Sequence, residues 1–129
     1  MTIALRVRCE ADVVCLRVPE GFRAEQVGDL IEALREVIAA HPARKLAVDV
    51  RPMTGLFTVT ERYHAGEQIA ARLPHDRAIA FIAAEAQMTP ERFLEVVAKN
   101  RGAHILVTTS PAEAAAWLGV PVELVELPS

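Results

Sequence analysis

The chain has little of what marks a secreted, membrane-spanning or disordered protein. Only two cysteines occur in its 129 residues, and charged residues or proline interrupt every apolar run before the ~18 residues that span a membrane. The N-terminal residues lack the basic start and the long apolar stretch of a signal peptide. Since 52% of the residues are hydrophobic, disorder is also excluded. We therefore expect a folded cytoplasmic protein with no membrane span.

No complete catalytic or cofactor-binding motif occurs in the sequence. The GxSxG, HExxH and P-loop patterns are absent, and no GxGxxG follows an expected strand. A zinc site needs three or four converging ligands, but only His64 has carboxylates close by, Glu61 and Glu67. The histidines are scattered at His41, His64, His75 and His104. We expect no metal and no cofactor, and we predict that the protein is not an enzyme.

Charge gives no reason to bind nucleic acid. Fourteen Lys and Arg residues stand against seventeen Asp and Glu, for a net charge of −3. The acidic excess comes from Glu113, Glu123 and Glu126 near the C-terminus, so the rest of the chain is neutral. A neutral body has no electrostatic attraction for nucleic acid or for an anionic membrane.

The two cysteines, Cys9 and Cys15, fall in an expected hairpin of strands 3–8 and 12–18. Period-two alternation places Cys9 on the apolar face and Cys15, beside Arg17, on the other face. The thiols then point to opposite sides of the sheet, so we expect no disulfide between them. One should be a core thiol and the other a surface or second-face thiol.

Apolar patterning predicts an α/β fold in ββαβαβαβα order, with a mixed, mostly parallel sheet that starts antiparallel. Further strands are expected at 45–51, 77–84 and 103–109, and helices at 27–38, 59–73, 90–101 and 111–118. Thr58, Thr89 and Ser110 are in position to cap the last three of these helices. A single domain, 1–119, is followed by an apolar, mildly acidic tail, 120–129, which could pack as an extra strand or cover a partner.

In such a sheet, ligands bind at the carboxyl ends of the strands, here the loops at 52–60, 85–90 and 108–111. The first loop carries Gly55 and three threonines near a helix N-terminus, where the helix dipole stabilises a phosphate: Thr54, Thr58 and Thr60. The simpler interpretation is that these threonines cap helices and form turns. Asp49 could accept a phosphoryl group or a metal, or could hydrogen-bond to the loop backbone and so position it.

Apolar residues around the same edge could line a small ligand groove, or could simply close the core. They are Met53, Leu56, Phe57, Tyr63, Met88 and Phe93.

Short segments along residues 3–118 resemble bacterial STAS-like proteins of the SpoIIAA-like group, relatives of the anti-sigma-factor antagonists. They are Asp49-Val50-Arg51, Thr54-Gly55, Glu61-Arg62-Tyr63, Leu73-Pro74, Arg77-Ala78, Arg92-Phe93, residues 97–102 and Ala115-Ala116-Trp117-Leu118. The resemblance implies a mixed sheet with helices mainly on one face. It also implies a non-enzymatic domain that binds a protein partner, often under control of Ser or Thr phosphorylation. The antagonists' Asp-Ser-Ser-Gly-type loop is absent, and Thr54-Gly55 is its nearest equivalent.

These observations lead to two functional hypotheses. The first is a regulatory module that binds a protein partner through loop 52–60 and the following helix, with phosphorylation of a loop threonine as its control. The second is a carrier of a small apolar or lipid-like ligand in the groove. The hairpin edge and the apolar tail also offer surfaces for a homodimer.

Overall fold

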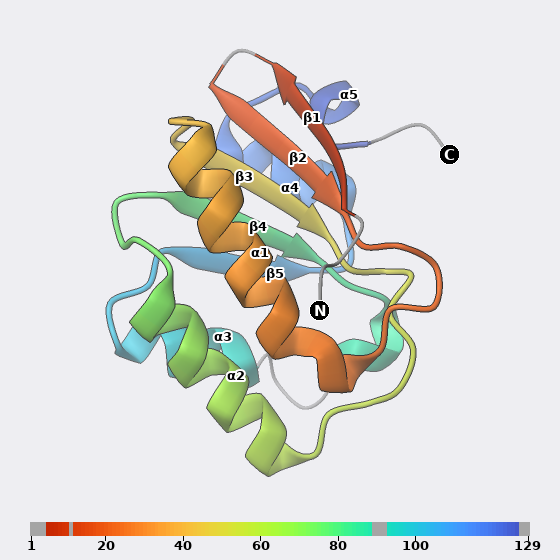
Figure 1. The fold of residues 1–129 in the computed structure, drawn as a ribbon. Coiled ribbons are helices and arrows are strands. Elements are labelled where there is room, and N and C mark those ends of the chain that lie inside the picture. The colour runs from red at the N-terminus through yellow and green to blue at the C-terminus, as the bar shows by residue number, and fades with distance from the viewer. Residues whose placement is uncertain (1–4, 11, 89–92, 127–129) are drawn as a thin grey trace.

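The computed structural model describes residues 5–10, 12–88 and 93–126 (Figure 1). The strands are β1 (Arg6–Glu10), β2 (Val13–Arg17), β3 (Lys45–Asp49), β4 (Ala78–Ile82) and β5 (Ile105–Thr108). The helices are α1 (Val27–Ala40), α2 (Val59–Arg72), α3 (Phe93–Asn100), α4 (Pro111–Leu118) and α5 (Val122–Val125). Short 3-10 turns at Ala24–Gln26 and Glu85–Gln87 precede α1 and α3.

The five strands form one sheet in the order β1-β2-β3-β4-β5. β1 and β2 pair antiparallel, and every other neighbouring pair is parallel. This confirms the prediction of an α/β fold with a mixed sheet that starts antiparallel. Since consecutive parallel strands are neighbours, their carboxyl ends lie along one edge, where the loops at 50–58 and 83–88 meet.

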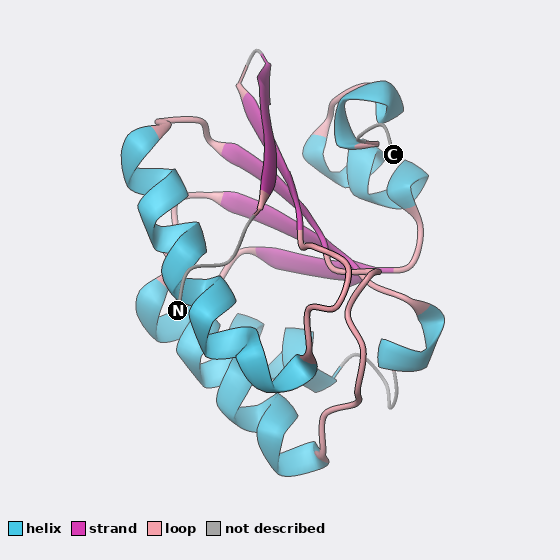
Figure 2. Cartoon of the chain, turned by 45° about the vertical axis from the view of Figure 1, so that its right-hand side comes forward, coloured by secondary structure: helices cyan, strands magenta, loops and turns pink. Residues whose placement is uncertain are grey.

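Helices cover the two faces of the sheet unequally, as Figure 2 shows. α1, α2 and α3 pack over one face on large strand residues such as Leu46, Val48 and Ile79. α4 and α5 pack over the other face, where Ala47 and Ala80 supply small side chains. The alternation of large and small residues along β3 and β4 thus separates a larger core from a smaller one.

Helix caps predicted from the sequence are present where they can be described. Thr58 Oγ1 accepts a hydrogen bond from Glu61 N at 3.1 Å, and Glu61 Oε1 accepts from Thr58 N at 2.7 Å, which completes a capping box. Ser110 Oγ accepts from Glu113 N at 3.1 Å. Gly119 ends α4 in the left-handed conformation, with φ of 72°. The predicted cap at Thr89 lies outside the described residues.

The tail forms a helix, not the extra strand considered from its composition. α5 lies against the smaller core, where the Val125 side chain is buried. Arg8 on β1 donates to the carbonyl oxygens of Glu123 and Leu124, both at 2.6 Å, and so connects the hairpin to the tail.

The cysteines lie on opposite faces as predicted, but the buried one is Cys15 and the exposed one is Cys9. Cys15 faces α4 and α5 in the smaller core, and both thiols are free. Period-two alternation assigned Cys9 to the covered face, together with Val7, which is also exposed. Both residues lie on β1, which is an edge strand of the described sheet and pairs with β2. The helices do not extend over this edge, so the side chains of Val7 and Cys9 are exposed although they alternate as those of a covered strand do.

Candidate functional site

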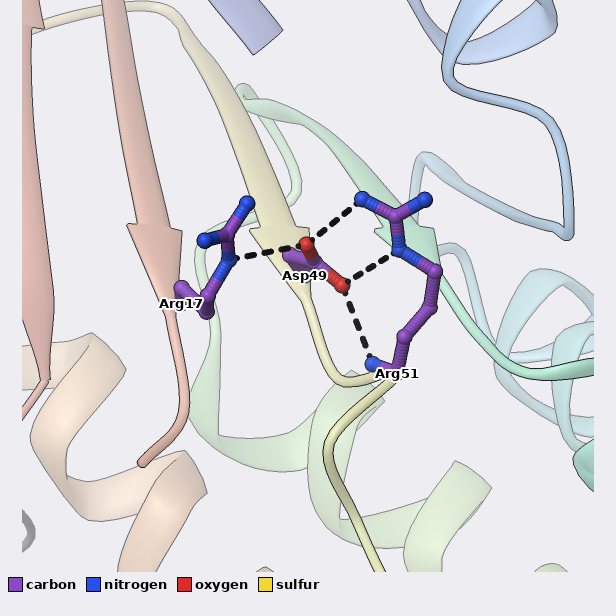
Figure 3. Close-up of polar contacts among 3 residues, drawn as sticks. All are labelled: Arg17, Asp49 and Arg51. Atoms are coloured by element: carbon purple, nitrogen blue, oxygen red, sulfur yellow. Dashed lines mark hydrogen bonds and ion pairs between the residues drawn. The ribbon is translucent and has the colours of Figure 1, made fainter. Parts of the chain in front are cut away.

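Asp49 at the end of β3 lies between two arginines (Figure 3). Its Oδ2 accepts from Arg17 Nε at 3.1 Å and from Arg51 Nη2 at 2.9 Å. Its Oδ1 accepts from Arg51 Nε and from the Arg51 backbone N–H, each at 3.0 Å. Burial alone raises the pKa of Asp49, but the hydrogen bonds from Arg51 and Arg17 outweigh it, so the pKa lies below its usual value.

This arrangement makes Asp49 a positioning residue for the loop that follows β3. Both carboxylate oxygens are occupied by donors, and the bond to Arg51 N fixes the first turn of the loop. A phosphoryl group or a metal would have to displace these donors. The hydrogen bond from Arg51 N to Asp49 agrees with the alternative in which Asp49 bonds to the loop backbone and so positions the loop.

The three candidate threonines differ in their surroundings. Thr54 hydrogen-bonds to Phe22 O through its backbone N–H at 2.9 Å and its hydroxyl at 3.3 Å. Thr58 caps α2, and Thr60 lies exposed in the first turn of that helix. Gly55 has a φ of +81°, and its carbonyl accepts from Gln87 Nε2 at 2.7 Å. The loop is therefore connected to both the β2–α1 segment and the β4–α3 segment.

A cavity of about 70 Å³ lies behind this loop. Met53, Phe57 and Met88 from the groove hypothesis line it. The other apolar residues of its wall are Val27, Leu30, Val50, Ile69, Phe81, Ala83 and Val107. These apolar residues of the wall come from α1, α2, the sheet and the two loops at its carboxyl edge.

Leu56 and Tyr63, also assigned to the groove, lie outside the cavity lining. Leu56 is 62% exposed. Tyr63 is 38% exposed, and its hydroxyl accepts from Arg101 Nη2 at 2.8 Å while the Arg101 guanidinium lies 5.2 Å from its ring centre. The side chain of Phe93 lies outside the described part of the structure.

Arg62 lies on the buried face of α2, next to the partly exposed Tyr63. The other buried residues of this helix are Ala65, Gly66, Ile69 and Ala70. Arginine is so seldom buried that its type argued against this position. The spacing of Ala65, Gly66 and Ile69 was the signal that could have placed Arg62 inside.

Among the residues that the structure describes, three polar side chains also line the cavity. Arg62 donates to the carbonyl oxygens of Phe57, at 3.4 Å, and Gln87, at 3.2 Å. Glu95 accepts from Val107 N at 2.6 Å. Gln87 completes the set. The sequence analysis did not single out any of the three as a site residue.

The fold also brings Cys9 to His41, with 3.4 Å between Sγ and Nδ1. These two residues are 32 positions apart in the chain, so no local motif joins them. Antiparallel pairing and the end of α1 place them together at a surface hollow that Asp12 and Pro42 also line. Among the residues that the structure describes, no three His, Cys, Asp or Glu side chains are grouped so as to hold a metal ion.

No known family model matches the chain, and no curated protein matches it either. Within the described ranges, none of the helices has the length and apolar character needed to cross a membrane.

Proposed function

We propose that the protein is a non-enzymatic, STAS-like regulatory module that binds a protein partner through loop 52–60 and the N-terminal half of α2. The observation that carries this proposal is the exposure of three apolar side chains within residues 56–63, which we call the apolar patch: Leu56, Val59 and Tyr63. The mixed sheet with helices mainly on one face is consistent with the STAS-like class.

The patch concentrates apolar surface in a short stretch of chain. The described residues include six exposed large apolar side chains, and three of them fall within residues 56–63. Val59 and Tyr63 lie one helical turn apart, so they share a face of α2. Tyrosine is a frequent hot-spot residue at interfaces, and the contact with Arg101 holds this ring in place before a partner arrives.

Phosphorylation of a loop threonine would act directly on this surface. Thr58 and Thr60 flank Val59, so a phosphate on either places about two negative charges beside the apolar patch. The N-terminal end of α2 would stabilise that phosphate. The expected effect is release of an apolar partner or recruitment of a basic one.

The proposal is tested by cross-linking in the native host followed by mass spectrometry. A double variant, Leu56→Ser with Val59→Ser, should lose the partner that the wild-type protein recovers. The matched control is Val122→Ser, which removes an exposed apolar side chain on α5. Equal recovery of the same partner by all three proteins would refute the proposal.

A second candidate function is a carrier of a small apolar ligand. The cavity behind the loop, with Met53, Phe57 and Met88 in its wall, favours this function. Native mass spectrometry of protein purified from its own host should show a non-covalent adduct that denaturation removes. A native spectrum that shows only the mass of the chain, with no adduct, would count against the carrier function.

A further inference from the structure

The two edges of the sheet differ in what covers them. At the β5 edge, Val107 N donates to Glu95 Oε1 of α3 at 2.6 Å, so α3 closes this side. β1 forms the other edge, and all of its side chains except that of Arg8 are exposed. Within the described part of the sheet, no strand lies on the outer side of β1 (Figure 1). An open edge of this kind can pair with a strand of another chain.

The hydrogen bonds of β2 show which way the backbone of β1 faces. Asp12 O accepts from Lys45 N, and Val18 N donates to Asp49 O. Even-numbered residues in and beside β2 therefore turn their backbone groups towards β3. The odd-numbered residues of β2 turn theirs towards β1, because successive residues of a strand alternate in direction.

The open edge of β1 is formed by the backbone of Val7 and Cys9. The odd-numbered residues of β2 stand opposite Arg6, Arg8 and Glu10, so these three residues face β2 with their N–H and C=O groups. The N–H and C=O groups of Val7 and Cys9 then point away from β2, to the outer side. These groups can form hydrogen bonds with a further strand.

The charges of β1 complement each other when the strand pairs antiparallel with a second copy of itself. If a two-fold axis passes through Arg8, Val7 of one copy stands opposite Cys9 of the other, and their outward backbone groups are paired. Arg6 of one copy then stands opposite Glu10 of the other, at both ends of the strand. Among the residues that the structure describes, neither Arg6 nor Glu10 forms an ion pair. Each therefore gains a neighbour of opposite charge.

Arg8 stands opposite its own copy in this register, but its charge is directed elsewhere. Its Nη2 atom donates to Glu123 O and Leu124 O, both at 2.6 Å. These bonds hold the guanidinium against α5 of the same chain. The repulsion between the two Arg8 side chains is reduced accordingly.

Two other registers also join outward backbone groups, and both fit less well. A centre on Val7 places Arg6 opposite Arg8 at both ends, which sets like charges against each other. A centre on Cys9 leaves Val7 beyond the end of the partner strand. The register centred on Arg8 is the one that pairs the whole of β1.

We propose that β1 pairs antiparallel with β1 of a second copy about a two-fold axis at Arg8, so that a homodimer shares one continuous sheet. β1 lies at the opposite edge of the sheet from α2 and α3 (Figure 1), so the dimer leaves loop 52–60 free on both copies. The Cys9 side chain points to the face of the sheet, and its thiol stays accessible. One strand from each copy buries less than the about 1,200 Å² of a standard interface, so the dissociation constant should be about 1 μM or weaker.

Sedimentation equilibrium of the full chain in reducing buffer, from about 1 μM to about 1 mM, tests the proposal. The mass should rise with concentration from 14.1 kDa towards twice that value. Cys9→Pro removes an outward N–H and should stay monomeric, whereas the matched control Cys9→Ser keeps this N–H and should dimerise as the wild type does. Urea unfolding verifies that the proline protein is folded. A wild-type monomer at every concentration, or a folded Cys9→Pro protein that dimerises normally, would overturn the proposal.

Exchange of the two end charges tests the register without proline. Arg6→Glu and Glu10→Arg each place like charges opposite each other and should weaken the dimer roughly tenfold. The double variant, Arg6→Glu with Glu10→Arg, should recover most of the wild-type affinity. Glu85→Arg, at an exposed position in the turn before α3, makes the same change of charge and should leave the dimer unaffected. A double variant that dimerises no better than the two single variants would show that the proposed pairing is wrong.

Discussion

The carboxylate of Asp49 receives both the side chain and the backbone N–H of Arg51, two residues further along the chain. Three hydrogen bonds of 2.9–3.0 Å join the pair. Arg17 on the neighbouring strand β2 adds a fourth, at 3.1 Å. The end of β3, the end of β2 and the start of loop 52–60 are thereby held together at one carboxylate.

Asp49→Asn should destabilise the protein by about 2–3 kcal/mol. The amide keeps the size of the carboxylate but removes the buried negative charge that lies between Arg17 and Arg51. Urea unfolding at neutral pH measures the change. Glu32→Gln removes exposed ion pairs with Arg35 and Arg72, so it should cost less than about 1 kcal/mol. Equal effects of the two substitutions would contradict the structural role assigned to Asp49.

The same carboxylate predicts a pH dependence. The pKa of Asp49 lies below the value of 3.8 that an unperturbed aspartate has, because the arginine hydrogen bonds outweigh burial. The unfolded chain therefore takes up the proton first, and stability is lost as pH falls below about 4. The stability difference between wild type and Asp49→Asn should be largest at neutral pH and should narrow towards pH 3. A constant difference across this range would show that the charge is not involved.

Much of the fold follows from patterns along the chain. The helical stripe through Leu30, Ile31 and Leu34 is buried as its spacing predicts, and the near-continuous apolar strand β4 lies inside the sheet. These predictions succeed because burial of a regular element leaves a period in the sequence. They fail at Val7 and Cys9, because the same alternation is found in an edge strand that the helices leave uncovered.

Fewer features of the candidate site than of the fold could be predicted from the sequence. Met53, Phe57 and Met88 could be placed at one sheet edge from the order of the strands. Arg62 could be placed on the inner face of α2 only from the helical spacing of Ala65, Gly66 and Ile69, and arginine is so seldom buried that its residue type argues against that position. The approach of Cys9 to His41 depends on strand register and on where α1 ends, neither of which a residue pattern specifies.

Thr58 and Thr60 should differ in their contribution to stability. Thr58→Ala removes the side-chain half of the α2 capping box and should cost about 1 kcal/mol. Thr60→Ala changes an exposed side chain within the first turn and should alter stability by less than about 0.5 kcal/mol. Thermal or urea unfolding compares the two proteins. Thr58→Ser, which keeps the capping oxygen, should recover most of the loss, and failure to do so would argue against the cap.

The two thiols should react at very different rates. Cys9 is exposed, whereas Cys15 is buried, and its burial raises the pKa of its thiol. Since the thiolate is the reactive form, iodoacetamide should modify Cys9 at least about tenfold faster in the folded protein. Peptide mass spectrometry during the reaction separates the two sites. In the Cys9→Ser protein the fast phase should vanish, and unfolding in urea should expose Cys15 and bring its rate close to that of Cys9. A fast reaction at Cys15 without denaturant would mean that α5 does not cover this thiol in solution.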